Sequence, residues 1–168
     1  MRGGLDGISS ARHVEGVPGT GVFEGSDMIR VLILDDSSDY LRALRGALRQ
    51  EFEVLTAENL DGAKALLDEV VGVVLIDVRL SEADEANREG LVFLQWAKER
   101  HPGVPMLMMS AYRNFDAAVE ALNTGADYFL RKPIDLRQLK NLLHEFGAKG
   151  LRPEHTAALR RQMEGKGE

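Results

Sequence analysis

Five short apolar runs alternate with five segments of helical periodicity between Ile29 and Gly147. The most constraining run is Val73–Asp77, which reads Val-Val-Leu-Ile before one terminal aspartate. A strand with no polar residue on either side is buried on both faces, as in a parallel sheet covered by helices. Parallel strands need crossover connections, and each connection here has the apolar spacing of a helix. The alternation therefore predicts an α/β fold with a doubly wound, five-stranded parallel sheet.

The elements of this fold can be bounded from the sequence. Strands are predicted over Ile29–Leu34, Phe52–Ala57, Val73–Asp77, Pro105–Met109 and Tyr128–Leu130. Apolar stripes predict the helices at Leu41, Leu44 and Leu48; at Leu60, Ala63, Leu66 and Val70; at Leu91, Leu94 and Ala97; at Phe115, Ala118, Val119 and Leu122; and at Leu136, Leu139, Leu142 and Phe146. Ser37, Ser38 and Asn59 are predicted N-caps, and Gly147 is expected to end the last helix.

The two ends of the chain differ in composition and apolar periodicity from the segment between Ile29 and Gly147. Residues 1–28 are rich in glycine, so we expect a flexible N-terminal tail before a folded domain over 29–147. Residues 148–168 predict a weakly helical extension or linker, too short for a helix-turn-helix. The net charge of −6 argues against direct nucleic-acid binding by the domain. The short apolar runs predict no membrane span, and the lack of cysteine fits a reducing cytoplasm.

Four of the predicted strands end in polar residues that can carry chemistry. Asp35 and Asp36 follow the first strand, Asp77 ends the third, Ser110 follows the fourth and Lys132 follows the fifth. The carboxyl ends of parallel strands lie at one edge of the sheet, where such folds bind ligands. We therefore expect these side chains to meet in one small site.

Carboxylates gathered in such a site repel one another. Two unit charges about 4 Å apart repel by about 4 kcal/mol at an effective dielectric of about 20. Lys132 offsets part of this repulsion, and a divalent cation is expected to offset the rest. Ligands that are all oxygen favour Mg²⁺, whereas zinc would need thiolates or clustered histidines. A metal, an ammonium and a hydroxyl around one carboxylate predict phosphoryl transfer to Asp77.

Four segments match, in order and spacing, the motifs of a known family: Val31–Asp36, Val73–Asp77, Met108–Ala111 and Gly125–Pro133. Through them residues 29–147 resemble the receiver domain of two-component response regulators. The resemblance implies a (βα)5 flavodoxin-like fold with strand order 2-1-3-4-5. It also implies a phosphorylation-dependent signalling switch rather than a metabolic enzyme, which takes its phosphoryl group from a sensor histidine kinase or a phosphotransfer protein.

The resemblance further implies roles for single residues around the phosphoacceptor, Asp77. Asp36 would bind Mg²⁺ directly, Asp35 would help through water, and the backbone carbonyl of Arg79 would complete the protein ligands. Lys132 would contact the phosphoryl group.

Other implied roles concern the response to phosphorylation. The Lys132–Pro133 peptide bond is expected to be cis. Ser110 would be the switch hydroxyl and Phe129 the switch aromatic ring. Rotation of the Phe129 ring would change the surface of the fourth helix, fifth strand and fifth helix, which a partner recognises. That partner could be a second copy, in a homodimer, or a downstream effector protein or domain.

The loop after Asp77 departs from the family pattern. Ser81 stands where the family often has proline, and Gly90 lies further from Asp77 than the usual glycine. We expect a long, exposed and mobile acidic loop over 81–90, with the acidic residues Glu82, Asp84, Glu85 and Glu89. Arg79 and Tyr112 occupy positions at which the family tunes phosphoryl hydrolysis. Both are large, so we hypothesise slow self-dephosphorylation.

Two other functions remain open from the sequence. A haloacid dehalogenase-type phosphatase also uses an aspartate nucleophile, but it needs a second acid where this chain has Ser37. A receiver-like interaction module that no longer accepts phosphate is the other alternative. The sequence identifies neither the cognate kinase nor the output, and it does not show whether the chain is part of a longer regulator.

Overall fold

The computed structural model describes residues 28–81, 83–111 and 115–150. The predicted tail before Met28, the extension from Leu151 onward and Tyr112 lie outside these residues. The strands are β1 (Ile29–Leu34), β2 (Phe52–Ala57), β3 (Val73–Asp77), β4 (Met106–Ser110) and β5 (Tyr128–Arg131). The helices are α1 (Ser38–Leu48), α2 (Leu60–Leu66), α3 (Glu89–Arg100), α4 (Phe115–Thr124) and α5 (Leu136–Gly150).

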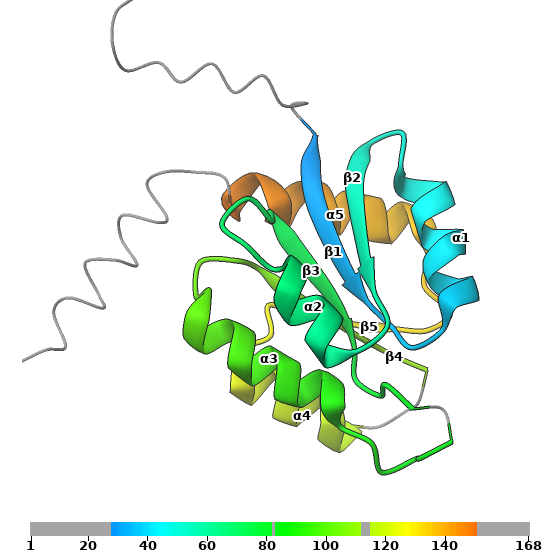
Figure 1. Cartoon of the computed structure of the whole chain (residues 1–168), viewed down its shortest axis with the longest axis vertical. Helices are drawn as coiled ribbons and strands as arrows, with labels where there is room; N and C mark the ends of the chain where they lie inside the picture. The colour runs from blue at the N-terminus through cyan, green and yellow to red at the C-terminus, as the bar shows by residue number, and fades with distance from the viewer. Residues whose placement is uncertain (1–27, 82, 112–114, 151–168) are drawn as a thin grey trace, which may run out of the picture.

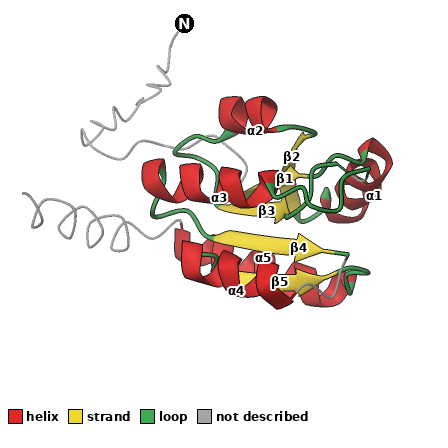
Figure 2. Cartoon of the chain, turned by 90° about the horizontal axis from the view of Figure 1, so that it is seen from below, coloured by secondary structure: helices red, strands yellow, loops and turns green. Residues whose placement is uncertain are grey.

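The strands form one parallel sheet in the order β2-β1-β3-β4-β5 (Figure 1). This confirms the predicted fold class and strand order. Helices lie on both sides of the strands (Figure 2). None of the helices in the described ranges is long and apolar enough to cross a bilayer.

Two apolar cores lie on opposite faces of the sheet. Val31 and Ile33 of β1 pack in the core that α1 and α5 complete, whereas Leu32 and Leu34 pack in the core formed with α2, α3 and α4. All four side chains are fully buried. Alternate residues of a strand point to opposite faces, so a strand buried on both sides must be apolar throughout.

The predicted helix starts are confirmed by their capping bonds. The Ser37 hydroxyl accepts a hydrogen bond of 3.2 Å from the Tyr40 amide at the start of α1. The Asn59 side chain accepts one of 2.8 Å from the Gly62 amide at the start of α2. These bonds satisfy amides that have no partner inside the helix. The Ser37 bond fixes the start of α1 directly after the acidic pair that follows β1.

The predicted extent of α2 was wrong at its C-terminal end. The helix ends at Leu66 instead of continuing to Val70, whose side chain is 55% exposed. The carboxylate of Asp68 accepts hydrogen bonds from the amides of Val70 and Val71, at 2.9 and 3.2 Å. A short polar side chain that captures nearby amides competes with the helix, and here it forms a turn.

The predicted apolar face of α4 was also wrong. Among the residues of this helix from Asp116 onward, Ala117 and Ala121 are buried, whereas Val119 and Leu122 are 40% and 53% exposed. Small residues allow α4 to lie close to its neighbours, so the larger apolar side chains do not mark the buried face. The exposed pair lies on the outer surface of α4.

Several boundaries near the end of the domain differ from the prediction. Gly147 does not end α5, which continues to Gly150. A Cβ atom on Gly147 would lie 2.5 Å from Cγ2 of Ile29, so this glycine allows close contact between α5 and β1. In α5 the fully buried leucines are Leu139 and Leu143, while Leu136 is 39% exposed. Smaller shifts affect four other boundaries: β4 begins at Met106 and ends at Ser110, β5 ends at Arg131 and α3 begins at Glu89.

Candidate functional site

The carboxyl ends of the strands bring the predicted site residues to one edge of the sheet. Carboxylate oxygens of Asp35, Asp36 and Asp77 all lie within 4.8 Å of one another. The Lys132 ammonium joins them from the end of β5, and the Lys132 amide donates a 2.8 Å hydrogen bond to the carbonyl of Ser110. Residues far apart in the sequence therefore form a single acidic site, as the order of the strands requires.

Lys132 contacts two of the three carboxylates. Its Nζ lies 2.6 Å from Oδ2 of Asp35 and 3.3 Å from Oδ2 of Asp77. The Asp35 side chain is 1% exposed, and that of Asp77 is 9% exposed. Such burial strengthens electrostatic interactions, and it also makes an uncompensated charge costly. The lysine is therefore the main compensation for the two buried carboxylates.

Backbone amides orient both of these carboxylates. Oδ1 of Asp35 accepts a 2.9 Å hydrogen bond from the Ser37 amide, which leaves Oδ2 to Lys132. Oδ1 of Asp77 accepts a longer bond, 3.4 Å, from the Arg79 amide. Asp35 is thus held firmly on both oxygens, whereas Asp77 is held less tightly. A weakly held carboxylate is the better placed of the two to react.

The acidic surroundings change the protonation of the site. Burial raises the pKa of Asp77 to about 7; the positive charge of Lys132 opposes this shift, and the charge of Asp35 adds to it. For Lys132, burial alone would lower the pKa, but the hydrogen bond to Asp35 and the two negative charges raise it above its usual value. The lysine is therefore charged at neutral pH, while Asp77 is only partly ionised without a further cation.

The remaining predicted residues lie around this centre. Ser110 ends β4 and is 6% exposed. Phe129 lies in β5, where it pairs with Met108 of β4. Its side chain is partly buried and packs against the core of α2, α3 and α4. The Lys132–Pro133 peptide bond is cis, the conformation that the resemblance implied.

Tyr40 is a site residue that the sequence reasoning missed. The Nζ of Lys132 lies 4.3 Å from the centre of its ring, within range of a cation–π interaction. Burial raises the pKa of the phenol, although the charge of Lys132 opposes the shift, so the ring stays neutral at neutral pH. One signal was present in the sequence: Tyr40 follows the acidic pair by about one helical turn and so points back toward it.

Gly90 explains how the next helix can begin beside Asp77. A Cβ atom on Gly90 would lie 1.8 Å from the backbone carbonyl oxygen of Asp77 and 2.8 Å from Cα of Val78. The Gly90 amide also donates a 3.0 Å hydrogen bond to the Val78 carbonyl. Only a residue without a side chain fits here, so Gly90 holds the start of α3 against the end of β3.

The donor set fits a divalent cation. Three carboxylates share the site with one ammonium group, which leaves net negative charge in a largely buried place. Oxygen ligands of this kind suit Mg²⁺, which accepts one or two carboxylates and keeps several waters. Burial, which raises the pKa of Asp77, and the nearby charge of Asp35, which raises it further, both disfavour the ionised carboxylate, and a bound cation would offset them. Asp36 is half-buried, and it is the most exposed of the three carboxylates.

Comparison with known proteins gives the same family. The response regulator receiver domain family matches residues 31–144. The chain belongs to this family. Among its relatives is the response regulator PilR of Pseudomonas aeruginosa, 36% identical over 116 residues, which cover 68% of this chain and 25% of PilR. Another is the transcriptional regulator ZraR of Escherichia coli K12, 36% identical over 123 residues, which cover 71% of this chain and 26% of ZraR.

Solved receiver domains share the fold. The receiver domain of NtrX from Brucella abortus aligns with a TM-score of 0.62 at 30% identity, over 70% of this chain and 98% of the other. A CheY-like receiver domain from Methanospirillum hungatei aligns with a TM-score of 0.65 at 27% identity, over 73% of this chain and 96% of the other. The chain spans about a quarter of the length of the curated relatives named above.

Proposed function

We propose that this receiver domain accepts a phosphoryl group on Asp77 from the phosphohistidine of a sensor histidine kinase or a phosphotransfer protein. One observation carries the proposal. Asp77 shares a lysine with Asp35, at 3.3 and 2.6 Å, inside a cluster of three carboxylates. Phosphoryl transfer depends on positive charge placed around the transferring group, and this site is built to hold such charge.

The chemical step uses groups at known positions. A carboxylate oxygen of Asp77 attacks the phosphorus atom, a new O–P bond forms, and the P–N bond to the donor imidazole breaks. The imidazole keeps the electron pair of that bond and takes up a proton. Lys132 moves its interaction from Asp77 toward the phosphoryl oxygens and neutralises part of their charge, while Asp35 continues to hold the lysine in place.

Mg²⁺ is the proposed cofactor of this step. Asp36 and Asp77 would bind it directly, with the carbonyl of Arg79, and Asp35 would assist through water. When bound, the cation neutralises negative charge on the carboxylates and on the transferring phosphoryl group. The chain's own contribution is to keep three carboxylates close together and oriented before the cation arrives.

The response to phosphorylation is proposed to pass through Ser110 and Phe129. Ser110 ends the strand next to β3, and Phe129 lies beside Met108 of that same strand. Movement of the Ser110 hydroxyl toward the phosphoryl group would let the ring of Phe129 turn inward. The result would be a population shift at the surface of α4, β5 and α5. Two large apolar side chains of α4, Val119 and Leu122, are exposed.

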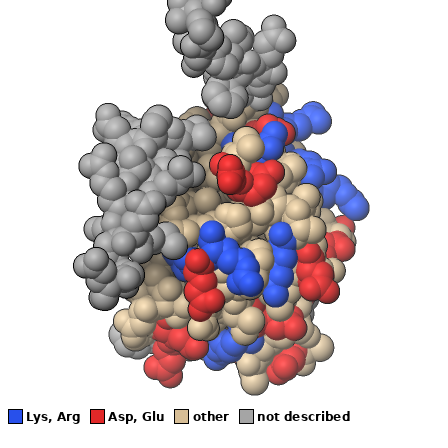
Figure 3. Space-filling view, turned by 60° about the vertical axis from the view of Figure 1, so that its left-hand side comes forward, with Lys and Arg blue, Asp and Glu red and all other residues tan. Residues whose placement is uncertain are grey.

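The output is proposed to be transcriptional, because ZraR is named a transcriptional regulator and spans about four times the matched segment. The partner that reads the switch would then be an effector domain or a second copy of the receiver. On the face shown in Figure 3, acidic and basic side chains are interspersed. The mixed surface charge and the net charge of −6 support signalling through protein contacts, without direct binding of nucleic acid or membrane by this domain. We place this signalling in the cytoplasm.

Slow loss of the phosphoryl group is a further part of the proposal. Arg79 lies two positions after the end of β3. It is half-buried, and its amide bonds to the Asp77 carboxylate of the acidic cluster. Together with Tyr112 it would obstruct an attacking water. Faster decay of the aspartyl-phosphate in Arg79→Asn, in Tyr112→Ala or in the double variant would support this. Unchanged decay in all of them would contradict it.

The decisive experiment is labelling with acetyl phosphate and Mg²⁺, followed by mass spectrometry of the intact protein and of its peptides. We expect one phosphoryl group on Asp77 and none in Asp77→Asn. Asp84→Asn, a change of the same kind in the nearby exposed loop, is the matched control and should label normally. No labelling of the wild type would favour an interaction module, and turnover of small phosphoesters would favour a phosphatase.

A further inference from the structure

The long segment between β3 and α3 closes on itself at its base. The side-chain oxygen of Asn87 accepts two backbone hydrogen bonds, one of 3.0 Å from the Leu80 amide and one of 3.1 Å from the Glu89 amide. Next to this clamp, the Gly90 amide bonds to the Val78 carbonyl at 3.0 Å. Residues 83–86, beyond the base, are exposed. The segment is therefore tied at the end that lies beside Asp77.

The Asn87 clamp acts on a particular peptide group. The Leu80 amide and the Arg79 carbonyl belong to the same planar unit, and among the described residues only the Lys132–Pro133 bond is cis. In a trans peptide, N–H and C=O point in opposite directions. By holding the N–H, Asn87 fixes the direction of the Arg79 carbonyl, the backbone ligand in the proposed metal site.

The same peptide group is anchored from a second side. The Leu80 side chain is 8% exposed and packs in the core of α2, α3 and α4. On the other side of the peptide, the Arg79 amide bonds to the Asp77 carboxylate at 3.4 Å. A unit held at both flanking residues and at its own N–H has little freedom to rotate. Such a carbonyl is preorganised before a cation binds.

We infer that Asn87 is a positioning residue for the divalent cation of this site, through its hydrogen bond to the Arg79–Leu80 peptide. The inference rests on the proposed function and deepens it. A hydrogen bond to the N–H orients the carbonyl and makes its oxygen a stronger ligand, as outer partners of metal ligands commonly do. Asn87 lies within the loop that is longer than usual, so the loop supplies the clamp that keeps its own base in order.

The test measures cation binding without any phosphoryl donor. Mn²⁺, which gives an electron paramagnetic resonance signal when unbound, is titrated into the whole chain, and Mg²⁺ then displaces it. Loss of an outer partner typically weakens metal binding by about 10- to 100-fold, and we expect about tenfold for Asn87→Ala because the loop is partly exposed. Asn87→Asp keeps an acceptor oxygen and should bind at least as tightly as the wild type.

Asn59→Ala is the matched control. Asn59 also accepts a backbone hydrogen bond through its side chain, 2.8 Å from the Gly62 amide, but it caps α2 and holds no peptide next to a proposed metal ligand. It should lose some stability and keep wild-type affinity for both cations. Thermal denaturation of each variant establishes that it is folded at the assay temperature.

The outcomes separate this inference from the function on which it rests. Affinity of Asn87→Ala within twofold of the wild type overturns the inference, as does equal weakening in Asn59→Ala. In either case, phosphoryl labelling of wild-type Asp77 leaves the proposed function standing. Absence of cation binding by the wild type overturns the inference, and absence of labelling as well overturns both.

Discussion

Lys132 and Asp35 lie 97 positions apart in the chain and are joined by a hydrogen bond of 2.6 Å. The bond links the end of β5 to the end of β1 across two intervening strands. It is shorter than the 3.3 Å contact of the same lysine with Asp77. The lysine is therefore anchored on Asp35, and its contact with Asp77 is the one that a phosphoryl group can replace.

Removal of this lysine should destabilise the metal-free protein and abolish phosphorylation. In Lys132→Ala, Asp35 and Asp77 lose their common partner inside the protein. Breaking a buried pair in this way costs about 3 kcal/mol or more of unfolding free energy. Urea denaturation at pH 8 measures the loss, and acetyl phosphate labelling measures the function.

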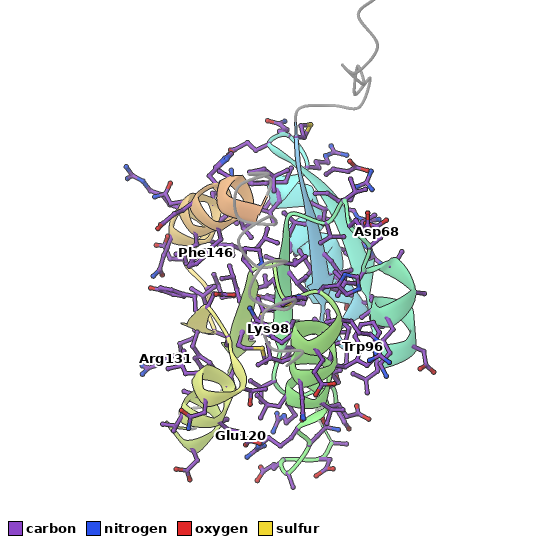
Figure 4. All side chains as sticks on the ribbon, turned by 90° about the vertical axis from the view of Figure 1, so that its left-hand side faces the viewer. Asp68, Trp96, Lys98, Glu120, Arg131 and Phe146 are labelled. Carbon is purple, nitrogen blue, oxygen red and sulfur yellow. The ribbon has the colours of Figure 1, made fainter. Side chains whose placement is uncertain are left out.

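Lys98→Ala is the control for that variant. The side chain of Lys98 is 20% exposed, which is similar to the 18% of Lys132. Lys98 pairs with Asp127 at 2.9 Å, but the side chain of Asp127 is 35% exposed, whereas that of Asp35 is 1% exposed. Lys98 lies on α3 (Figure 4), and its ion-pair partner, Asp127, is not one of the three carboxylates of the acidic cluster. We expect a loss of about 1 kcal/mol or less and normal labelling. Equal losses in the two variants would contradict the special role of the Lys132 pair.

The stability of the metal-free protein should fall as the pH rises through the titration of Asp77. The folded protein holds this proton up to a pKa of about 7, whereas the unfolded chain releases it near 3.8. Between these values the folded state binds more protons, so its stability decreases with pH. At about 1.4 kcal/mol per pKa unit, the decrease reaches at most about 4 kcal/mol.

Urea denaturation in the presence of EDTA, at pH 5 and pH 8, measures this dependence. Asp77→Asn removes the titrating group and should show a much smaller decrease, which makes it more stable than the wild type at pH 8. An identical decrease in both proteins would show that Asp77 does not cause it. Saturating Mg²⁺ should reduce the decrease in the wild type, because the cation stabilises the ionised carboxylate.

The ring of Tyr40 should contribute to the reactivity of the site by holding the ammonium group of Lys132. A cation–π interaction of about 0.5–2 kcal/mol corresponds to about a 2- to 30-fold effect. We therefore expect Tyr40→Leu to slow phosphorylation by acetyl phosphate, and Tyr40→Phe, which keeps the ring, to retain nearly the wild-type rate. Equal rates in Leu and Phe variants would remove the ring from the mechanism.

Replacement of Gly90 by alanine should damage the site through the backbone. The new Cβ atom would meet the Asp77 carbonyl oxygen at 1.8 Å, so either β3 or α3 must move. We expect a loss of about 3 kcal/mol or more of unfolding free energy and a strong loss of cation affinity. Gly46→Ala is the control, because Gly46 lies within α1 and its Cβ would meet nothing within 4 Å. That variant should gain up to about 1 kcal/mol from helix propensity.

The sequence predicted the parts of the fold that depend on burial. β1, β2 and β3 have the predicted bounds. β1 and β3 lie inside the covered sheet, so they must be largely apolar and must end where polar residues begin. β2 lies at the edge of the sheet, and its bounds are its two buried residues, Phe52 and Ala57. The acidic cluster and its lysine could be predicted for the same reason, since parallel strands fix which ends meet. Asx turns and close helix packing were harder to predict: the end of α2 depends on Asp68, and the buried face of α4 depends on alanines.

The least predictable features are contacts between side chains from different elements. The position of Tyr40 one helical turn after the acidic pair was a weak signal, but its contact with Lys132 depends on the exact placement of the first turn of α1 relative to the residues that follow β5. Trp96 is similar: it packs, partly buried, against the core of α2, α3 and α4, and Lys64 of α2 and Arg100 each lie 5.2 Å from its ring centre. It lies on the side of α3 that faces α2 (Figure 4). Such contacts require coordinates.

The closed base of the loop after β3 has a consequence for how this receiver can diversify. Since Asn87 and Gly90 fasten the two ends beside Asp77, the exposed residues 83–86 form an appendage mechanically separated from the chemistry. Natural variation or protein engineering can alter the length and charge of that appendage, or graft a recognition peptide or fluorophore there, while the phosphoacceptor keeps its surroundings.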